Sequence, residues 1–121
     1  MPSNDKLLYV FSRAPYSTSS GQEGLDASLV GAAFDCTISV LFIHDGVFQL
    51  LKGQNCEATQ LKQYTKAFSA LQDFGIEKIY LHDLSSVARG IEVDQLIQDV
   101  ELVNTAQVSD IIAQQHRVFT F

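Results

Sequence analysis

Five short apolar runs divide the chain, and none of them alternates with polar residues as a half-exposed strand would. Continuous runs of this length are typical of strands that are covered on both faces. The runs are Leu7–Phe11, Thr37–Ile43, Lys78–Leu81, Val100–Val103 and Val118–Phe121. Segments of helical period lie between them. This alternation predicts an α/β fold, a three-layer α/β/α domain with a mainly parallel sheet of about five strands.

Two of the intervening segments carry signals for the ends of a helix. Ser20-Gly21-Gln22-Glu23 fits a capping box, in which the Ser20 hydroxyl accepts from the Glu23 amide, so a first helix is predicted to begin near Gly21. Asn55 suits the cap of a second helix, and Gly75 suits the left-handed position after its end. The apolar stripe of this second helix comprises Leu61, Tyr64, Phe68 and Leu71.

The second half of the chain predicts two further helical segments. A short turn runs from Ser85 or Ser86 through Arg89 and is closed by Gly90, and a last helix runs from Thr105 to Gln115. The pattern of residues 91–99 leaves their structure undecided. The chain has no repeat, linker or low-complexity block and only two prolines, so we interpret residues 1–121 as a single domain.

Composition narrows the class of protein. The formal net charge is −6, so the chain lacks the basic excess that neutralises nucleic-acid phosphates, and no direct nucleic-acid binding is expected. The apolar runs are too short for a signal peptide or a membrane span. We therefore expect a cytoplasmic protein that does not bind a membrane.

Cys36 and Cys56 show no pairing at metal-ligand spacing, and structural disulfides are rare in cytosolic chains. We therefore interpret both as free thiols and predict no metal and no cofactor. Cys36 precedes a strand, on the side of the sheet away from ligands, and is interpreted as a small buried hydrophobe. Cys56 starts the predicted second helix, whose dipole lowers the pKa of the thiol while Glu57 opposes this. Cys56 is thus either a nucleophile or an unreactive loop cysteine.

Ligands of a parallel α/β sheet gather beyond the carboxyl ends of the strands. The first loop at that edge, Ser12 to Ser20, offers many hydroxyls ahead of a helix N-terminus, which favours an anion. The candidate anion-binding residues are Ser12, Arg13, Ser17, Thr18, Ser19 and Ser20. Because Gly-x-Gly-x-x-Gly and Walker spacings are absent, a simple polar loop with a capping serine is the alternative.

The second loop is apolar where a solvated loop need not be. Asp45-Gly46 forms a turn and Gly53 ends the segment, and between them lie Val47, Phe48, Leu50 and Leu51. Burying Phe48, Leu50 and Leu51 is worth about 1.5–3 kcal/mol for each side chain. The segment is predicted to be a protein interface, although self-packing or a mixture of the two is also open.

The third loop places His82 directly after a strand, beside Asp83 and ahead of a short helix. Its residue type and place make His82 a candidate general base. Neighbouring side chains on an extended backbone point apart, however, and no nucleophile is tied to His82 by spacing.

Four stretches in this order, LLYVFSRAPYST, GQEGLDASL, LFIHDGVFQLLKGQ and SSVARGI, resemble the DsrE/DsrF-like sulfur-relay proteins, and specifically their TusC/DsrF branch. The resemblance covers nearly the whole chain and is most specific at Gly46 to Leu51. It implies a subunit of a hetero-hexamer with TusB-like and TusD-like siblings. In the active subunit of the family, a persulfide-carrying cysteine lies eight residues ahead of the glycine of an Arg-Gly pair. The matching residue before Gly90 is His82, which cannot hold a persulfide.

The resemblance therefore implies a non-catalytic TusC-like subunit of a heteromeric sulfurtransferase complex that contributes to 2-thiolation of the tRNA wobble uridine. It gives His82 at most the role of a polar residue near the site, with no part in catalysis. A DsrF-type subunit in sulfur oxidation is the alternative within the family. Outside it, the alternatives are a stand-alone thiol sulfurtransferase using Cys56 and a flavin- or nucleotide-binding module using Ser12 to Ser20. On the scaffold interpretation, Val47 to Leu51 contacts the sibling chains.

Overall fold

The computed structural model describes residues 5–14, 20–34, 36–51, 65–76, 78–96 and 99–121. Five strands form one sheet in the order β4-β3-β2-β1-β5, and every neighbouring pair is parallel. Each strand end lies within one residue of the apolar runs, so the predicted parallel sheet is confirmed. The strands are β1 (Lys6–Phe11), β2 (Thr37–Phe42), β3 (Lys78–His82), β4 (Glu101–Val103) and β5 (Arg117–Thr120).

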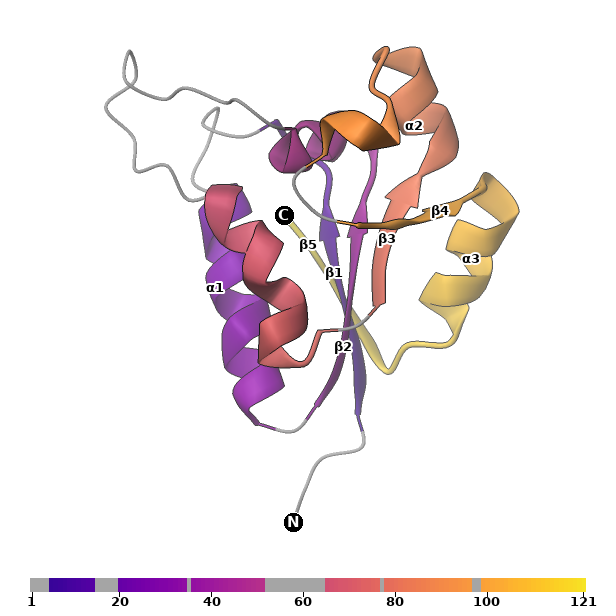
Figure 1. Cartoon of the computed structure of the whole chain (residues 1–121). Coiled ribbons are helices and arrows are strands. Elements are labelled where there is room, and N and C mark those ends of the chain that lie inside the picture. Colours follow the sequence, from indigo (N-terminus) through magenta and orange to yellow (C-terminus); the bar gives the residue numbers. More distant parts are fainter. Residues whose placement is uncertain (1–4, 15–19, 35, 52–64, 77, 97–98) are drawn as a thin grey trace.

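Helices cover both faces of the sheet, as the three-layer prediction requires. α1 (Ser20–Ala33) and the 3-10 helix η3 (Thr65–Phe74) lie on one face, and α3 (Thr105–Ala113) lies on the other (Figure 1). Three shorter segments complete the described chain: η1 (His44–Leu50) after β2, α2 (Asp83–Ala88) after β3, and η4 (Val93–Gln95) before β4.

Alternate residues of the central strands supply two apolar cores, which is why their sequences do not alternate with polar residues. Toward α1, the rings of Phe11 and Phe42 stack with centroids 5.0 Å apart, and Phe68 of η3 meets each of them edge-on at 5.3 Å. Toward α3, the buried core consists of Leu8, Val10, Leu41, Val103 and Val108.

The structure confirms some of the predicted helix ends and corrects others. α1 begins at Ser20, one residue before the prediction, and the Ser20 side chain, with its predicted capping box, lies outside the description. α3 begins as predicted and has a full capping box: Asn104 Oδ1 accepts from the Gln107 N–H at 2.8 Å, and Gln107 Oε1 accepts from the Asn104 N–H at 2.8 Å. It ends at Ala113, before the predicted Gln115.

The second predicted helix is described only from Thr65, so Asn55, Leu61 and Tyr64 lie outside the described residues. The described part winds as a 3-10 helix and not as the expected α-helix. Phe68 and Leu71 are fully buried as predicted, and their spacing of three residues places them on one side of a 3-10 helix. Gly75 adopts a φ of +89°, which confirms its left-handed position.

The remaining segments begin earlier or are shorter than expected. α2 starts at Asp83, ahead of the predicted Ser85 or Ser86, while Gly90 closes it with a φ of +67° as predicted. Within the undecided stretch of residues 91–99, η4 forms a single turn capped by Glu92, whose backbone N–H donates to Gln95 Oε1 at 2.8 Å.

Candidate functional site

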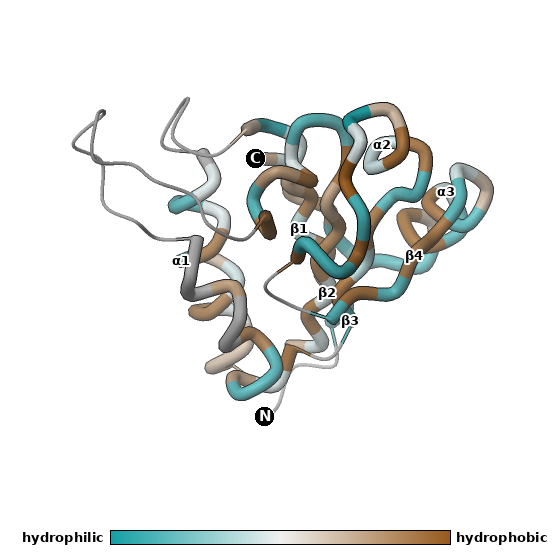
Figure 2. The backbone as a smooth tube through the Cα atoms, turned by 45° about the horizontal axis from the view of Figure 1, so that its top comes forward, coloured by the Kyte–Doolittle hydropathy of each residue, from teal (hydrophilic) through white to brown (hydrophobic). Residues whose placement is uncertain are grey.

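The carboxyl ends of the parallel strands meet at one edge of the sheet, where η1 and α2 follow β2 and β3 directly. Figure 2 turns this edge forward and shows α2 beside α3, with α1 on the other side of the sheet. Ligands of such sheets bind beyond this edge. A functional site is therefore expected at this edge.

His82, the last residue of β3, has both ring nitrogens engaged in hydrogen bonds. Its Nδ1 lies 2.7 Å from Ser85 Oγ and its Nε2 lies 2.9 Å from Thr105 Oγ1. The side chain is only 8% exposed. A ring that is buried and fully bonded offers no free nitrogen to a substrate, so this geometry does not favour His82 as a general base.

Ser85 lies at the centre of a hydrogen-bond network. Its Oγ accepts from the His44 backbone N–H at 2.8 Å and also bonds to His82 Nδ1, since a hydroxyl oxygen has one hydrogen to donate and two lone pairs to accept with. His82 Nε2 in turn bonds to Thr105 Oγ1. This Ser85 network (His44, His82, Ser85 and Thr105) ties η1, β3, α2 and α3 together.

The turn into η1 is held by an unusual backbone and a close approach. His44 has a φ of +54°, a left-handed conformation that is uncommon for a residue with a side chain. A Cβ placed on Gly46 would lie 1.7 Å from the carbonyl oxygen of Phe11, at the end of β1. Only glycine allows this approach, which explains the turn predicted at Asp45-Gly46.

The prediction that Val47 and Leu50 form a protein interface is wrong, because both are fully buried in the core of their own chain. The close approach at Gly46 folds η1 back against the sheet, so these side chains face inward. Phe48 and Leu51 are half-buried and pack against the same core. The segment is thus a mixture of fully buried and half-buried side chains. A contact of Phe48 and Leu51 with another chain stays a prediction.

An ion pair links the end of α2 to η1. Arg89 Nε donates to Asp45 Oδ1 at 2.9 Å, and Arg89 Nη1 donates to the Ser85 carbonyl at 3.2 Å. The Asp45 side chain is 59% exposed, so water screens the pair and its contribution is about 0–1 kcal/mol. It orients α2 more than it stabilises the fold.

The hydroxyl-rich loop is described only at its two ends. Ser12 Oγ donates to the Phe121 carbonyl at 3.1 Å, and the Arg13 carbonyl accepts from the buried Gln49 amide at 3.0 Å. The first hydroxyl and the backbone of this loop thus serve the fold. Ser17, Thr18 and Ser19 and the side chain of Ser20 lie outside the described residues, so anion binding by this loop stays a prediction.

The described cysteine lies at the opposite edge of the sheet. Cys36 lies just before β2, with its sulfur 4.0 Å from the Phe34 carbonyl. It packs against the core but is only half-buried, so its prediction as a small buried hydrophobe is confirmed in part. Burial, and secondly the charge of Cys36, raises the pKa of the nearby Tyr9. Cys56 lies outside the described residues. Within the described part, no group of three or more His, Cys, Asp and Glu residues is arranged to hold a metal ion.

A surface that the sequence prediction missed lies directly beside His82. In α2 the polar Ser85 and Ser86 are buried, while Leu84 is 61% and Val87 is 74% exposed. We call Leu84 and Val87 the α2 apolar surface. Their spacing of three residues puts them on one helix face, and the two serines between them were the signal that this helix is turned outward.

A second apolar area lies beside β4, the outermost strand at one side of the sheet. Val93 and Leu102 are about half-exposed there, and they border an open hollow of about 570 Å³ that also includes Asp94, Asp99 and Val100. Within the described part of the chain, no helix is both long and apolar enough to cross a membrane.

Comparison with known proteins identifies relatives of the whole chain. The sequence model of the DsrE/DsrF-like family matches residues 5–121. A TusC homolog of Vibrio vulnificus (strain CMCP6) is 39% identical over 116 residues, which cover 96% of this chain and 98% of the homolog. The intracellular sulfur oxidation protein DsrF of Allochromatium vinosum is 33% identical over 130 residues, which cover 96% of each chain.

A solved structure shares the fold. The crystal structure of the ychN protein from E. coli superposes with a TM-score of 0.82 over 97% of this chain and 99% of that chain. The two sequences are 20% identical, so this likeness concerns the arrangement of strands and helices.

Proposed function

Because this chain belongs to the DsrE/DsrF-like family, we propose that it is a TusC-like, non-catalytic subunit of a heteromeric sulfurtransferase complex that contributes to 2-thiolation of the tRNA wobble uridine. The observation that carries the proposal is His82. On this view it occupies the place at which an active sibling holds its persulfide cysteine. Its ring is buried and engaged through both nitrogens, an arrangement suited to support of the fold and not to group transfer.

The work of such a subunit is to bind its siblings, and the α2 apolar surface supports this role. Leu84 and Val87 leave most of their surface in water, and covering each of them with a partner is worth about 1.5–3 kcal/mol. The Ser85 network and the ion pair of Arg89 with Asp45 hold α2 in a fixed orientation. A rigid apolar surface loses little entropy on association, which favours tight assembly.

Assembly tests this role. Co-expression with TusB-like and TusD-like siblings, followed by affinity purification and native mass spectrometry, should recover a hetero-hexamer. The double substitution Leu84→Asp and Val87→Asp should leave a folded chain that no longer co-purifies. Phe34→Asp is the matched control, since Phe34 is 72% exposed but follows α1 at the other edge of the sheet. Undiminished co-purification of the double variant would contradict the proposed interface.

Sulfur loading tests the absence of catalysis. When the purified complex receives persulfide from a cysteine desulfurase and cysteine, mass spectrometry of each subunit should find the added sulfur on the TusD-like sibling and not on this chain. Loading of this chain, and its loss in Cys56→Ser, would instead establish the stand-alone thiol sulfurtransferase.

A DsrF-type role in sulfur oxidation is a second candidate, favoured by the 33% identity to the Allochromatium vinosum protein over almost the full length of both chains. The two roles share the same scaffold chemistry. Deletion of the gene distinguishes them, because loss of 2-thiouridine from tRNA supports the first role and loss of sulfur oxidation with normal tRNA supports the second.

A further inference from the structure

A cavity of about 150 Å³ lies far from the carboxyl edge, where the amino ends of the strands meet the end of α3. Every residue that lines it has a polar side chain. We call it the amino-edge cavity, and its lining residues are Lys6, Thr37, Ser39, Lys78, Tyr80, Gln114 and Gln115. Polar atoms and the hydrocarbon parts of these side chains both face the cavity, so it is able to take a small ligand that forms hydrogen bonds.

The register of the sheet brings the two lysines to this cavity. Lys6 of β1 pairs with Thr37 of β2, and Lys78 of β3 pairs with Ser39 of β2. Two ammonium groups therefore flank the hydroxyls of the central strand on one face of the sheet. Further along the same strands this face becomes apolar and packs against α3.

Gln115 supplies a hydrogen-bond acceptor with no partner. Its Nε2 donates to the Ile111 carbonyl at 3.0 Å, which fixes the orientation of the amide. Its Oε1 is buried and has no hydrogen-bond partner among the described residues. A buried acceptor without a donor is unfavourable, so a ligand that places an O–H or N–H here relieves that cost.

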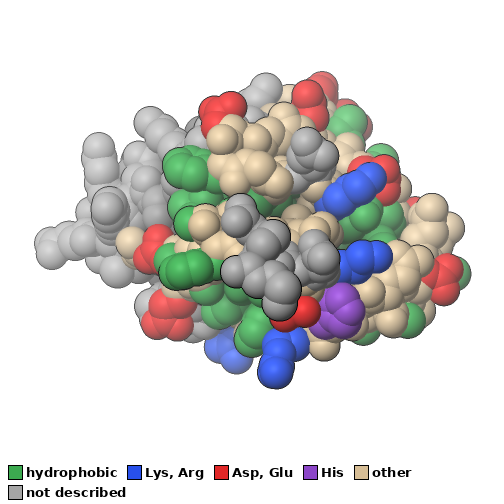
Figure 3. Space-filling view, turned by 90° about the horizontal axis from the view of Figure 1, so that it is seen from below, with side chains coloured by type: hydrophobic (Ala, Val, Ile, Leu, Met, Phe, Trp, Pro, Cys, Tyr) green, Lys and Arg blue, Asp and Glu red, His purple; other side chains and the backbone are tan. Residues whose placement is uncertain are grey.

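Tyr80 and the two lysines supply hydrogen-bond donors to the cavity. Burial, and secondly the charge of Glu101, raises the pKa of Tyr80, so its phenol keeps its proton at neutral pH and is able to donate. Figure 3 shows lysine and arginine side chains near a histidine on this face of the molecule, with an acidic side chain directly beside that histidine. Basic side chains thus gather here in a chain of net charge −6.

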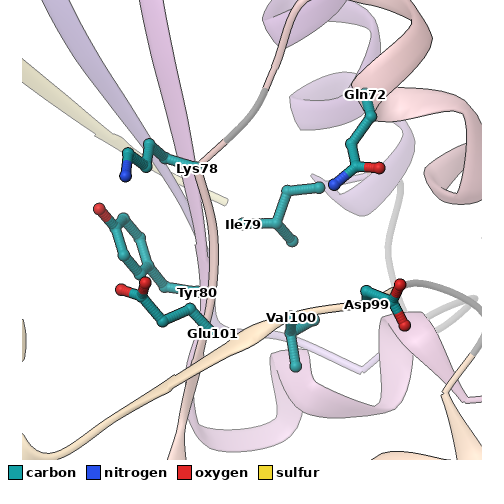
Figure 4. A pocket seen from close by; sticks show the side chains of 7 residues that line it. All are labelled: Gln72, Lys78, Ile79, Tyr80, Asp99, Val100 and Glu101. Carbon is teal, nitrogen blue, oxygen red and sulfur yellow. The ribbon is translucent and has the colours of Figure 1, made fainter.

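The neighbouring hollow of about 210 Å³ differs in a way that decides the ligand. It shares Lys78 and Tyr80 but also includes Asp99 and Glu101, and Figure 4 shows Glu101 on the same side as Tyr80. Two carboxylates line that hollow and repel an anion there. No carboxylate lines the amino-edge cavity itself, although the charge of Glu101 reaches Tyr80 from beside it and opposes an anion more weakly. The carboxyl end of α3 also opposes an anion, so binding requires both lysines.

We propose that the amino-edge cavity binds a small oxyanion that keeps an O–H at neutral pH, with hydrogen phosphate as the simplest example. The ammonium groups of Lys6 and Lys78 and the Tyr80 hydroxyl donate to the oxyanion, and its O–H donates to Gln115 Oε1. A volume of about 150 Å³ has room for about five water molecules, enough for one tetrahedral oxyanion. Sulfate has the same shape but no O–H at neutral pH, so it should bind more weakly.

Amide NMR titrations of the full chain with sodium phosphate and sodium sulfate, at equal ionic strength, test this inference. Phosphate should produce saturable shifts at residues of the cavity, and sulfate should bind more weakly. Lys6→Gln and Lys78→Gln should each raise the Kd for phosphate about tenfold, because each removes a charge-assisted hydrogen bond. Gln115→Met should remove the preference for phosphate over sulfate.

Arg117→Gln is the matched control, because Arg117 starts the edge strand β5 but does not line the cavity. It removes one charge from the same region and should change the Kd by much less than either lysine variant. Absence of saturable shifts would overturn the proposal. So would shifts at the Ser12 to Ser20 loop that are lost in Arg13→Gln and kept in Lys78→Gln, because the anion would then bind at the carboxyl edge.

Discussion

Replacing Ser85 by alanine is expected to be far more damaging than replacing its neighbour Ser86, although both serines are buried in α2. Ser85 joins the His44 N–H to His82 Nδ1, whereas Ser86 Oγ donates only to the Asp83 carbonyl of its own helix, at 2.9 Å. The two substitutions gain the same helix propensity and remove the same atom. Their difference in stability therefore measures the Ser85 network.

The magnitude follows from what each substitution leaves without a partner. Ser85→Ala leaves the buried Nδ1 of His82 without a partner, which costs about 1–3 kcal/mol. It also removes the bond to the partly solvated His44 N–H, which costs about 0.5–1.5 kcal/mol. We expect a total loss of about 2–4 kcal/mol in the free energy of unfolding. Ser86→Ala loses one local bond and about 0.5–1.5 kcal/mol.

Urea denaturation followed by far-ultraviolet circular dichroism measures both losses. With a slope of about 1–3 kcal/mol per molar urea for a small protein, Ser85→Ala should lower the midpoint by about 1 M or more, and Ser86→Ala by less than half as much. The slope itself should not change. Equal midpoints for the two variants would refute the assigned network and, with it, the fixed orientation of α2.

Three further outcomes are expected. Gly46→Ala should unfold the chain or lower its stability by about 3 kcal/mol or more in the same urea assay, because the added methyl meets the Phe11 backbone, which cannot move aside as a side chain would. Arg89→Ala should lower the free energy of unfolding by about 1 kcal/mol or less, because water screens the exposed bond to Asp45. The loss should shrink in high salt, because salt ions screen such a pair further. The pKa of Tyr80 is raised by burial and then by a neighbouring carboxylate, so the folded state holds this proton more tightly than the unfolded state. Stability should therefore fall as the pH rises above about 10, the ordinary pKa of tyrosine, and Tyr80→Phe should weaken that fall in urea midpoints measured across this range.

The apolar runs predicted the sheet well because strand burial is a local property of the sequence. A run such as Leu7–Phe11 has apolar side chains on both faces, so both faces must be covered, and a parallel sheet between helices meets that need. Capping residues succeeded for the same reason: Asn104 and Gln107 satisfy each other within one turn. Gly75 and Gly90 end their segments through their own backbone angles.

The candidate site was predicted less well, because its contacts join residues far apart in the chain. Nothing near His82 in the sequence indicates that Thr105 will hold its second nitrogen. The outward turn of α2, which exposes Leu84 and Val87, depends on the bond from Ser85 to His44, 41 residues away. Sequence pattern indicates where polar groups lie along an element but not which distant group satisfies them.

By itself, the sequence determined that this protein has a parallel sheet covered on both faces and that residue 82, at the end of the third strand, is not a thiol. It also determined that the segment from Val47 to Leu51 must be covered by something. Only the tertiary structure decided what covers it: the Gly46 backbone approaches Phe11 so closely that Val47 and Leu50 enter the core of their own chain. The physical reason is that hydrophobicity requires burial without specifying the partner, and the partner is chosen by packing between elements distant in the chain.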